Sequence, residues 1–158
     1  MPQIKAPISV SGSDAAWSKN GAGTTILCTS DPISSPNDST YISNAAADPI
    51  RVKVDPADHP NQVDGLKIKI RAQGSDALQT FTLRLYQGAT LIAEYIDLPA
   101  EAGSFKTTEQ ELTEEEAASI TDYSDLYLEA QSQTSDQLDV SVLELEAADR
   151  ILRVYVTT

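Results

Sequence analysis

The 158-residue chain has a mass of 17.0 kDa, 41% hydrophobic residues and a net charge of −13. This length and composition predict a single folded domain and exclude a largely disordered chain. The negative charge also disfavours nucleic acid as a partner, because it repels the phosphate backbone.

The first third of the chain, residues 1–62, is rich in Ser, Asp, Asn, Pro and Ala, and is typical of loops. Brief apolar clusters predict short strands at 24–28 and 50–54, and a third that begins with Thr40-Tyr41-Ile42. Cys28 ends one of these clusters, so we expect a buried side chain rather than a reactive thiol.

An N-terminal arm over residues 1–17 is expected to precede a single domain over 18–158. The arm carries apolar side chains between prolines and small polar residues, namely Ile4, Ile8, Val10 and Trp17. This composition predicts a segment that binds a protein partner through those four side chains. Two alternatives remain open: Ile8 and Val10 form an edge strand, or Trp17 closes one end of the core.

From residue 63 onward, apolar and polar residues alternate, which indicates strands with one buried face. The predicted strands cover 66–72, 81–86, 91–96, 126–130 and 138–142, and a last one carries Leu152, Val154 and Val156. The second and third of them form a hairpin that turns at Gly88. At 142–145 the alternation slips by one residue, which indicates a bulge or a change of sheet. The expected core includes Leu66, Ile68, Ile70, Leu83, Leu85, Leu128, Val140 and Val142.

One short helix is predicted near 113–120. Thr113 and Glu116 have capping-box spacing, and three glutamates in the first turn favour the helix dipole. Several short strands with one helix predict an all-β fold, a two-sheet antiparallel sandwich of the jelly-roll type. An immunoglobulin-like sandwich is the alternative.

The sequence offers no catalytic residues, metal site or cofactor motif that we can identify. His59 is the only histidine and lies between Asp58 and Pro60, which favours an exposed turn. Calcium is the alternative for two loops whose side chains offer oxygen ligands. These residues are Asp31, Asn37 and Asp38 in one loop and Asp55, Asp58 and Asp64 in the other. We interpret them as turn residues. No apolar run suits a signal peptide or a membrane span, so we expect no membrane partner.

Short motifs follow one another across residues 17–146. In chain order they are Trp17 with Gly21 and Gly23, Asp38-Ser39-Thr40-Tyr41-Ile42, the strand 63–72, Leu85-Tyr86-Gln87-Gly88, and the late pair 122–128 and 140–145. This order resembles small jelly-roll-like β-sandwich accessory proteins of tailed-phage virions. The second tryptophan that is usual in that class is missing here, and Phe105 and Lys106 stand near its place.

The resemblance implies a non-enzymatic capsid decoration (cement) protein that binds the outer surface of a phage head and stabilises it. Its partner would be the major capsid protein or another virion protein, and it would form a homo-oligomer in the assembly. The expected location is the virion, after synthesis in the host cytoplasm.

Two other functions stay open. A carbohydrate- or receptor-binding jelly-roll module of a tail fibre would need exposed aromatic side chains in line. The candidates are Tyr86, Tyr95, Tyr127 and Tyr155. A hydrolase is the third possibility, because a catalytic triad is defined by geometry rather than by sequence order.

Overall fold

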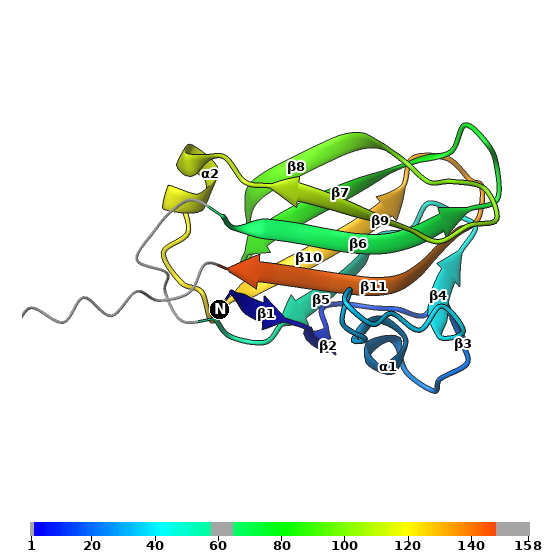
Figure 1. The fold of residues 1–158 in the computed structure, drawn as a ribbon, viewed down its shortest axis with the longest axis horizontal. Coiled ribbons are helices and arrows are strands. Elements are labelled where there is room, and N and C mark those ends of the chain that lie inside the picture. Colours follow the sequence, from blue (N-terminus) through cyan, green and yellow to red (C-terminus); the bar gives the residue numbers. More distant parts are fainter. Residues whose placement is uncertain (1, 58–64, 148–158) are drawn as a thin grey trace, which may run out of the picture.

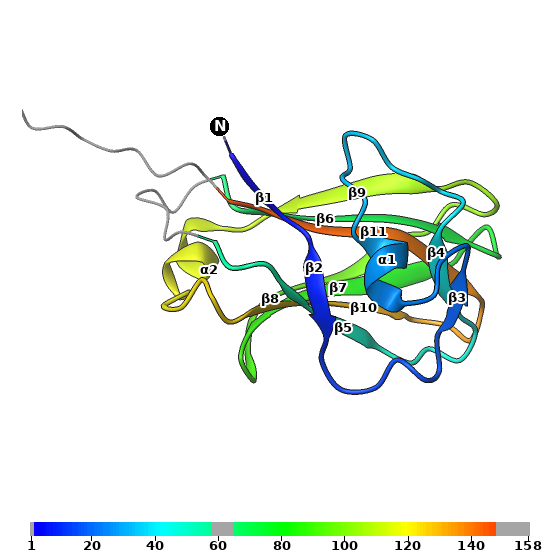
Figure 2. The same cartoon turned by 90° about the horizontal axis from the view of Figure 1, so that it is seen from below.

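Two stacked antiparallel sheets form the fold in the computed structural model, which describes residues 2–57 and 65–147 (Figures 1 and 2). The strands of one sheet are β1 (Gln3–Lys5), β3 (Ser18–Asn20), β4 (Tyr41–Asn44), β6 (Lys67–Gly74), β9 (Lys106–Glu111) and β11 (Leu138–Ala147). Those of the other are β2 (Pro7–Val10), β5 (Ile50–Val54), β7 (Thr80–Gln87), β8 (Thr90–Pro99) and β10 (Leu126–Ser132). The described residues also form helices α1 (Thr25–Thr29) and α2 (Glu114–Ala118).

The strand order is β3-β4-β11-β6-β9 in the six-stranded sheet, where β1 also pairs with β11. It is β2-β5-β10-β7-β8 in the five-stranded sheet. The prediction of an all-β, two-sheet antiparallel sandwich of the jelly-roll type is therefore confirmed. No helix in the described ranges is long and apolar enough to cross a membrane.

The core lies between the sheets because alternate side chains of each strand point inward. Along β6, every second residue is buried, as the period of two requires. All eight predicted core residues are buried, together with Phe81, Ile42 and Leu143. Full burial of a large apolar side chain contributes about 1.5–3 kcal/mol, so this layer dominates the stability of the sandwich.

Several local predictions are confirmed. β7 and β8 form the expected hairpin, and Gly88 turns it with a φ of 56°, which favours glycine. Helix α2 carries the predicted capping box, in which the Thr113 hydroxyl accepts from Glu116 N and the Glu116 side chain accepts from Thr113 N. The slip near residue 142 is a bulge, because the register with β6 shifts between Val140 and Val142.

The strand predicted at 24–28 is wrong, because this segment forms helix α1. The Thr24 hydroxyl caps the helix by accepting from Leu27 N at 3.2 Å. Thr25, Cys28 and Thr29 share the buried side, with the spacing of one helix face. The helix covers one open edge between the two sheets (Figure 2). Tertiary packing along this edge overrides the β preference of Thr and Ile. Cys28 is fully buried, as expected.

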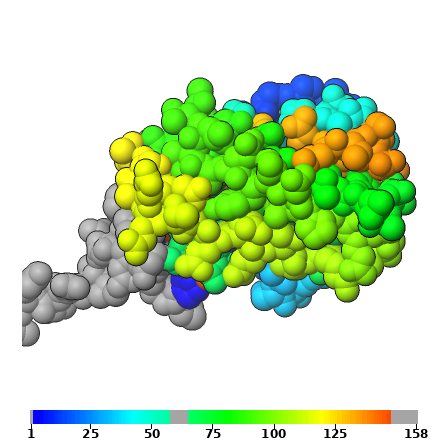
Figure 3. Space-filling view, turned by 90° about the horizontal axis from the view of Figure 1, so that it is seen from above, coloured from blue at the N-terminus to red at the C-terminus, as the bar shows by residue number. Residues whose placement is uncertain are grey.

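The opposite edge of the sandwich needs no such helix. Residues in the green to yellow part of the colour range, which includes β8 and β9, cover that side (Figure 3). Tyr95 of β8 donates from its hydroxyl to the carbonyl of Glu111 and to Glu116, and thereby ties the two sheets together. Burial, followed by the nearby Glu116 carboxylate, raises the pKa of Tyr95 to about 12.

Most of the predicted arm belongs to the sheets. β1 pairs with β11, whereas β2 pairs with β5, so residues 3–10 pass from one sheet to the other. The segment therefore follows the edge-strand alternative considered for Ile8 and Val10. Its contact with a partner stays a prediction. The predicted last strand, with Leu152, Val154 and Val156, lies outside the described residues.

Candidate functional site

The outer face of the five-stranded sheet brings together polar and aromatic side chains from four strands. Tyr127 of β10 lies opposite Lys53 of β5 and opposite Tyr86 of β7. The next outward row contains Arg51, Glu129, Arg84 and Glu94, which are also registered partners. Because residues two positions apart along a strand share a face, these rows are neighbours.

The first row is an aromatic pair flanked by cations. The Arg51 guanidinium lies over the Tyr86 ring, 3.8 Å from its centroid, and Lys53 Nζ lies 5.6 Å from the centroid of Tyr127. The Tyr127 hydroxyl donates to Asp125 at 3.0 Å. Both tyrosines are partly exposed. Cation–π contacts of this kind hold the rings in position without covering them completely.

The second row is a chain of alternating charges. Glu129 is 7% exposed and accepts from Arg51 Nη2 and Arg84 Nη1, both at 2.9 Å. Arg84 Nε donates to Glu94 at 2.6 Å. Burial by itself disfavours the charged guanidinium, but its bonds to Glu94 and Glu129 outweigh burial and raise the pKa of Arg84. Charge-assisted hydrogen bonds therefore hold the side chains of this row in place.

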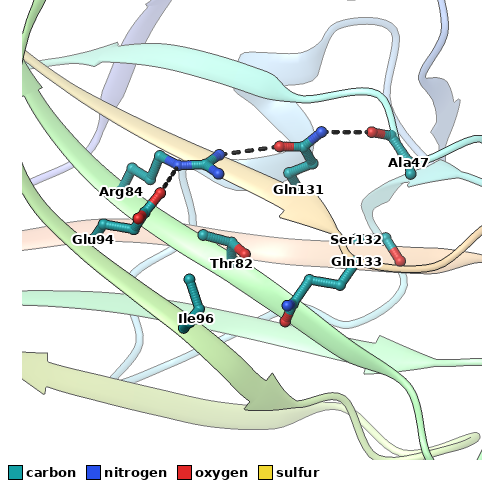
Figure 4. Close-up of a pocket in the computed structure, with 8 residues that line it drawn as sticks. All are labelled: Ala47, Thr82, Arg84, Glu94, Ile96, Gln131, Ser132 and Gln133. Atoms are coloured by element: carbon teal, nitrogen blue, oxygen red, sulfur yellow. Dashed lines mark hydrogen bonds and ion pairs between the residues drawn. The ribbon is translucent and has the colours of Figure 1, made fainter.

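Beyond this row the face is hollowed by about 490 Å³ (Figure 4). Its lining residues are Ala47, Thr82, Arg84, Glu94, Ile96, Gln131, Ser132 and Gln133. A bulge in β8 opens the hollow, because Phe81 pairs with Leu98 but Leu83 pairs with Tyr95, which leaves one extra residue on β8. Bulges of this kind often lie beside functional sites, where they redirect a side chain.

Two strained backbone positions lie at the hollow. Ala47 and Asp97 both have a φ of 57°, and they are the non-glycine residues with positive φ in the described ranges. Ala47 lines the hollow, and Asp97 follows the lining residue Ile96. Such backbone costs about 1–3 kcal/mol and persists only where the surrounding structure enforces it.

Two outward glutamines hold the strained positions. Gln131 donates to the carbonyl of Ala47 at 2.9 Å, as Figure 4 shows, while its oxygen accepts from Arg84 at 3.0 Å. Gln133 accepts from the backbone N–H of Asp97 at 2.8 Å and donates to its carboxylate at 3.0 Å. The glutamines thus fix the hollow by linking β10 and the residue that follows it to both sides of the hollow.

The outer face of the six-stranded sheet also carries ion pairs and hydrogen bonds. Asp38 accepts two hydrogen bonds from Arg71, at 2.7 and 2.5 Å, and one from Ser141 at 3.0 Å. The Arg71 hydrogen bond holds the pKa of Asp38 below its usual value. Lys69 forms ion pairs with Glu109, Glu144 and Glu146.

The predicted partner-binding residues have different environments. Ile4 and Ile8 are 46% and 48% exposed on the edge strands β1 and β2. Val10 is partly buried against the core. Trp17 is 2% exposed, and its indole N–H has no hydrogen-bond partner in the described structure. Trp17 therefore belongs to the core, in agreement with the alternative that it closes one end of the core. Its side chain offers no surface to a partner.

In the described parts of the two loops considered for calcium, two of the carboxylates contact other side chains. Asp31 accepts from the Thr40 hydroxyl at 3.2 Å, and Asp55 lies 3.9 Å from Lys5. No group of three or more metal-ligating side chains occurs within residues 2–57 and 65–147. His59 lies outside the described residues, as do Asp58 and Asp64.

Of the four candidate tyrosines, the structure brings Tyr86 and Tyr127 together, turns Tyr95 toward α2, and does not describe Tyr155. Sequence reasoning missed Gln131, Gln133 and Ala47. Alternation along β10 and into the residue after it places the two glutamines on the same side as Tyr127, and this was the available signal. No pattern in the sequence marks Ala47.

No protein-family profile and no curated protein sequence matches the chain. Among solved structures, the CBM22-1–GH10 modules of xylanase Xyn10B from Clostridium thermocellum, in complex with xylohexaose, match with a TM-score of 0.50 and 11% identity. That match covers 99% of this chain but 30% of the xylanase chain.

Two further structures have lower scores. The xylan-binding module CBM15 has a TM-score of 0.49 and 12% identity, over 96% of this chain and all of that module. The Stig cyclase FisC from Fischerella sp. TAU has a TM-score of 0.46 and 14% identity, over 87% of each chain. The Xyn10B match extends over nearly the whole length of this chain, at low identity. This likeness concerns the fold, which by itself does not assign a function.

Proposed function

We propose that this chain is a non-enzymatic carbohydrate-binding module that holds a glycan on the outer face of its five-stranded sheet. One observation carries the proposal, namely that the tyrosine pair, the charged row and the hollow adjoin on a single face. Ligand sites are typically concave, with apolar surface and a few fixed polar groups, and volumes of about 300–1,000 Å³ are common. The hollow of about 490 Å³ falls in this range.

Each of the three features suits a different part of a sugar. The C–H face of a pyranose ring packs against an aromatic ring such as Tyr127. Sugar hydroxyls need fixed donors and acceptors, which Arg84 and Glu94 supply in a rigid arrangement. Ile96, 57% exposed at the hollow, adds apolar contact next to these groups. Rigid polar groups reduce the ordering cost of binding.

The decisive experiment is a glycan array followed by calorimetry on each glycan that binds. The panel includes xylo-oligosaccharides, because the Xyn10B structure holds xylohexaose. Tyr127→Ala should weaken binding about tenfold or more, since truncated aromatic anchors often cost 1–2 kcal/mol or more.

The matched control is Tyr41→Ala. Tyr41 belongs to the other sheet and packs on Phe105 with a centroid distance of 5.6 Å. This variant should bind glycans as the native chain does, and thermal melting should show that both variants fold. Absence of glycan binding, or equal losses in the two variants, would contradict the proposal.

We also propose a second function, a virion decoration protein bound to the major capsid protein or another virion protein. The observation that favours it is the exposed apolar edge formed by Ile4, Ile8 and Leu27, which are 46%, 48% and 60% exposed. Exposed apolar side chains on neighbouring elements often mark a protein contact. The strands β1 and β2 hold two of these residues, and α1 holds the third.

A double variant tests this second function. Ile4→Ser with Ile8→Ser should remove co-sedimentation with phage heads from the same genome and leave the melting temperature nearly unchanged, because both side chains are half exposed. Leu78→Ser is the control, since Leu78 is 87% exposed in the loop between β6 and β7. If the double variant co-sediments as the native chain does, these side chains are not the contact.

A further inference from the structure

We infer that the site selects uncharged glycans over anionic ones, and that Glu94 determines this selectivity by neutralising Arg84 while presenting an acceptor beside it. The inference rests on the proposed carbohydrate-binding function and specifies the class of ligand. It follows from the charges on the face, from the unused hydrogen-bonding groups of the Arg84–Glu94 pair, and from the charge of the whole chain.

Three cations of this face, in the part of the chain that the structure describes, are each matched by a carboxylate. Arg51 pairs with Glu129 at 2.9 Å, and Lys53 lies 3.5 Å from Asp125. Arg84 contacts both Glu94 and Glu129. These contacts pair three cations with three carboxylates, so none of the three cations is free of a carboxylate partner. A glycan carboxylate or sulfate would have to compete with a protein carboxylate already in place.

Arg84 and Glu94 still present hydrogen-bonding groups to the hollow. Arg84 uses Nε for Glu94, and it uses Nη1 for Glu129 and Gln131. In the described structure its Nη2 amino group has no hydrogen-bond partner, and Glu94 accepts through Oε2 only. In Figure 4, the guanidinium lies on the side of the hollow next to Gln131, with Thr82 between it and Gln133.

This pair matches two neighbouring hydroxyls of a sugar ring. One hydroxyl accepts from Arg84 Nη2, while the adjacent hydroxyl donates to Glu94 Oε1, so neither charge loses its partner. An anionic group can accept from Arg84 but cannot donate to Glu94, and it meets repulsion from Glu94 and Glu129. The net charge of −13 adds a long-range repulsion of the same sign.

The test compares xylohexaose with oligogalacturonate of the same length, by calorimetry, for the native chain and two variants. We expect the native chain to prefer the neutral hexasaccharide, with an affinity that changes little between 50 and 500 mM salt. Glu94→Gln leaves Arg84 with one carboxylate and removes the charged acceptor. The ratio of neutral to anionic affinity should then fall about fivefold, as expected for a partly exposed ion pair.

Glu109→Gln is the matched control. The Glu109 side chain is 43% exposed and pairs with Lys67 and Lys69 on the opposite sheet, whereas the Glu94 side chain is 40% exposed. This variant should keep the native ratio. A native preference for the anionic glycan, or equal ratios in both variants, would overturn the inference while glycan binding still stands. Absence of binding to every glycan on the array would instead refute the proposed function, and the inference with it.

Discussion

Replacing Ala47 by glycine should stabilise the protein and lower its affinity for a glycan at the proposed site. The φ of Ala47 is 57°, in the left-handed region where a Cβ is unfavourable. Glycine removes this strain, which costs roughly 1–2 kcal/mol, but its greater freedom in the unfolded chain costs roughly 0.4–1 kcal/mol. The expected net gain is about 0.5–1 kcal/mol, equivalent to a rise in melting temperature of about 1–4 °C.

Although Ala47→Gly should stabilise the protein, it should weaken glycan binding. Gln131 holds the Ala47 carbonyl at 2.9 Å, and this contact fixes one side of the hollow. A glycine at this position samples more conformations, so a ligand must order the segment again when it binds. Calorimetry with a glycan that the array identifies should show a loss of about two- to fivefold in affinity, by an ordering cost of up to about 1 kcal/mol.

The neighbouring Ala46→Gly variant is the control for Ala47→Gly. Ala46 is exposed and its φ is not positive, so glycine relieves no strain there. This variant should lose roughly 0.4–1 kcal/mol through the unfolded chain alone. Urea melts of the three proteins measure the difference. If both glycine variants are destabilised equally, the backbone at Ala47 is not strained, and the surrounding structure does not force this side of the hollow into its conformation.

Three further predictions concern stability. Truncating the fully buried Ile68 to Ala should cost about 2–5 kcal/mol in chemical denaturation, because it opens a cavity between the sheets. Removing the cap of α2 with Thr113→Ala should cost about 0.5–2 kcal/mol. The hydrogen bond from Arg71 lowers the pKa of Asp38 in the folded protein. The contribution of Asp38 to the free energy of unfolding is therefore present above about pH 4 and is lost as the pH falls through the folded pKa. Asp38→Asn should remove this part of the acid dependence of stability.

Each of the three has an outcome that contradicts it. An Ile68→Ala variant within 1 kcal/mol of the native protein would mean that the strand phase of β6 is wrong. Thr113→Ser keeps the hydroxyl and should restore most of the stability lost in Thr113→Ala; if it does not, the cap is not the cause. An unchanged acid transition in Asp38→Asn would place the acid sensitivity elsewhere.

The sequence by itself determined the β-sandwich and much of its core. Alternation with a period of two marks β6 and β7, because a strand at the surface of a core must bury every second side chain. The cap of α2 and the turn at Gly88 were also predictable, since they depend on interactions within a few residues. These features are local, and local chemistry is what a single sequence displays.

Only the tertiary structure decided where the proposed binding face lies. Tyr86 and Tyr127 become neighbours through the pairing of β7 with β10, and the sequence contains no signal for that register. Helix α1 formed where a strand was predicted, because packing on the open edge of the sandwich favours a helix there. The hollow depends on the β8 bulge and on Ala47, whose strain is enforced by contacts from distant segments. Such contacts are long-range, and their energies exceed the local preferences that a sequence pattern reports.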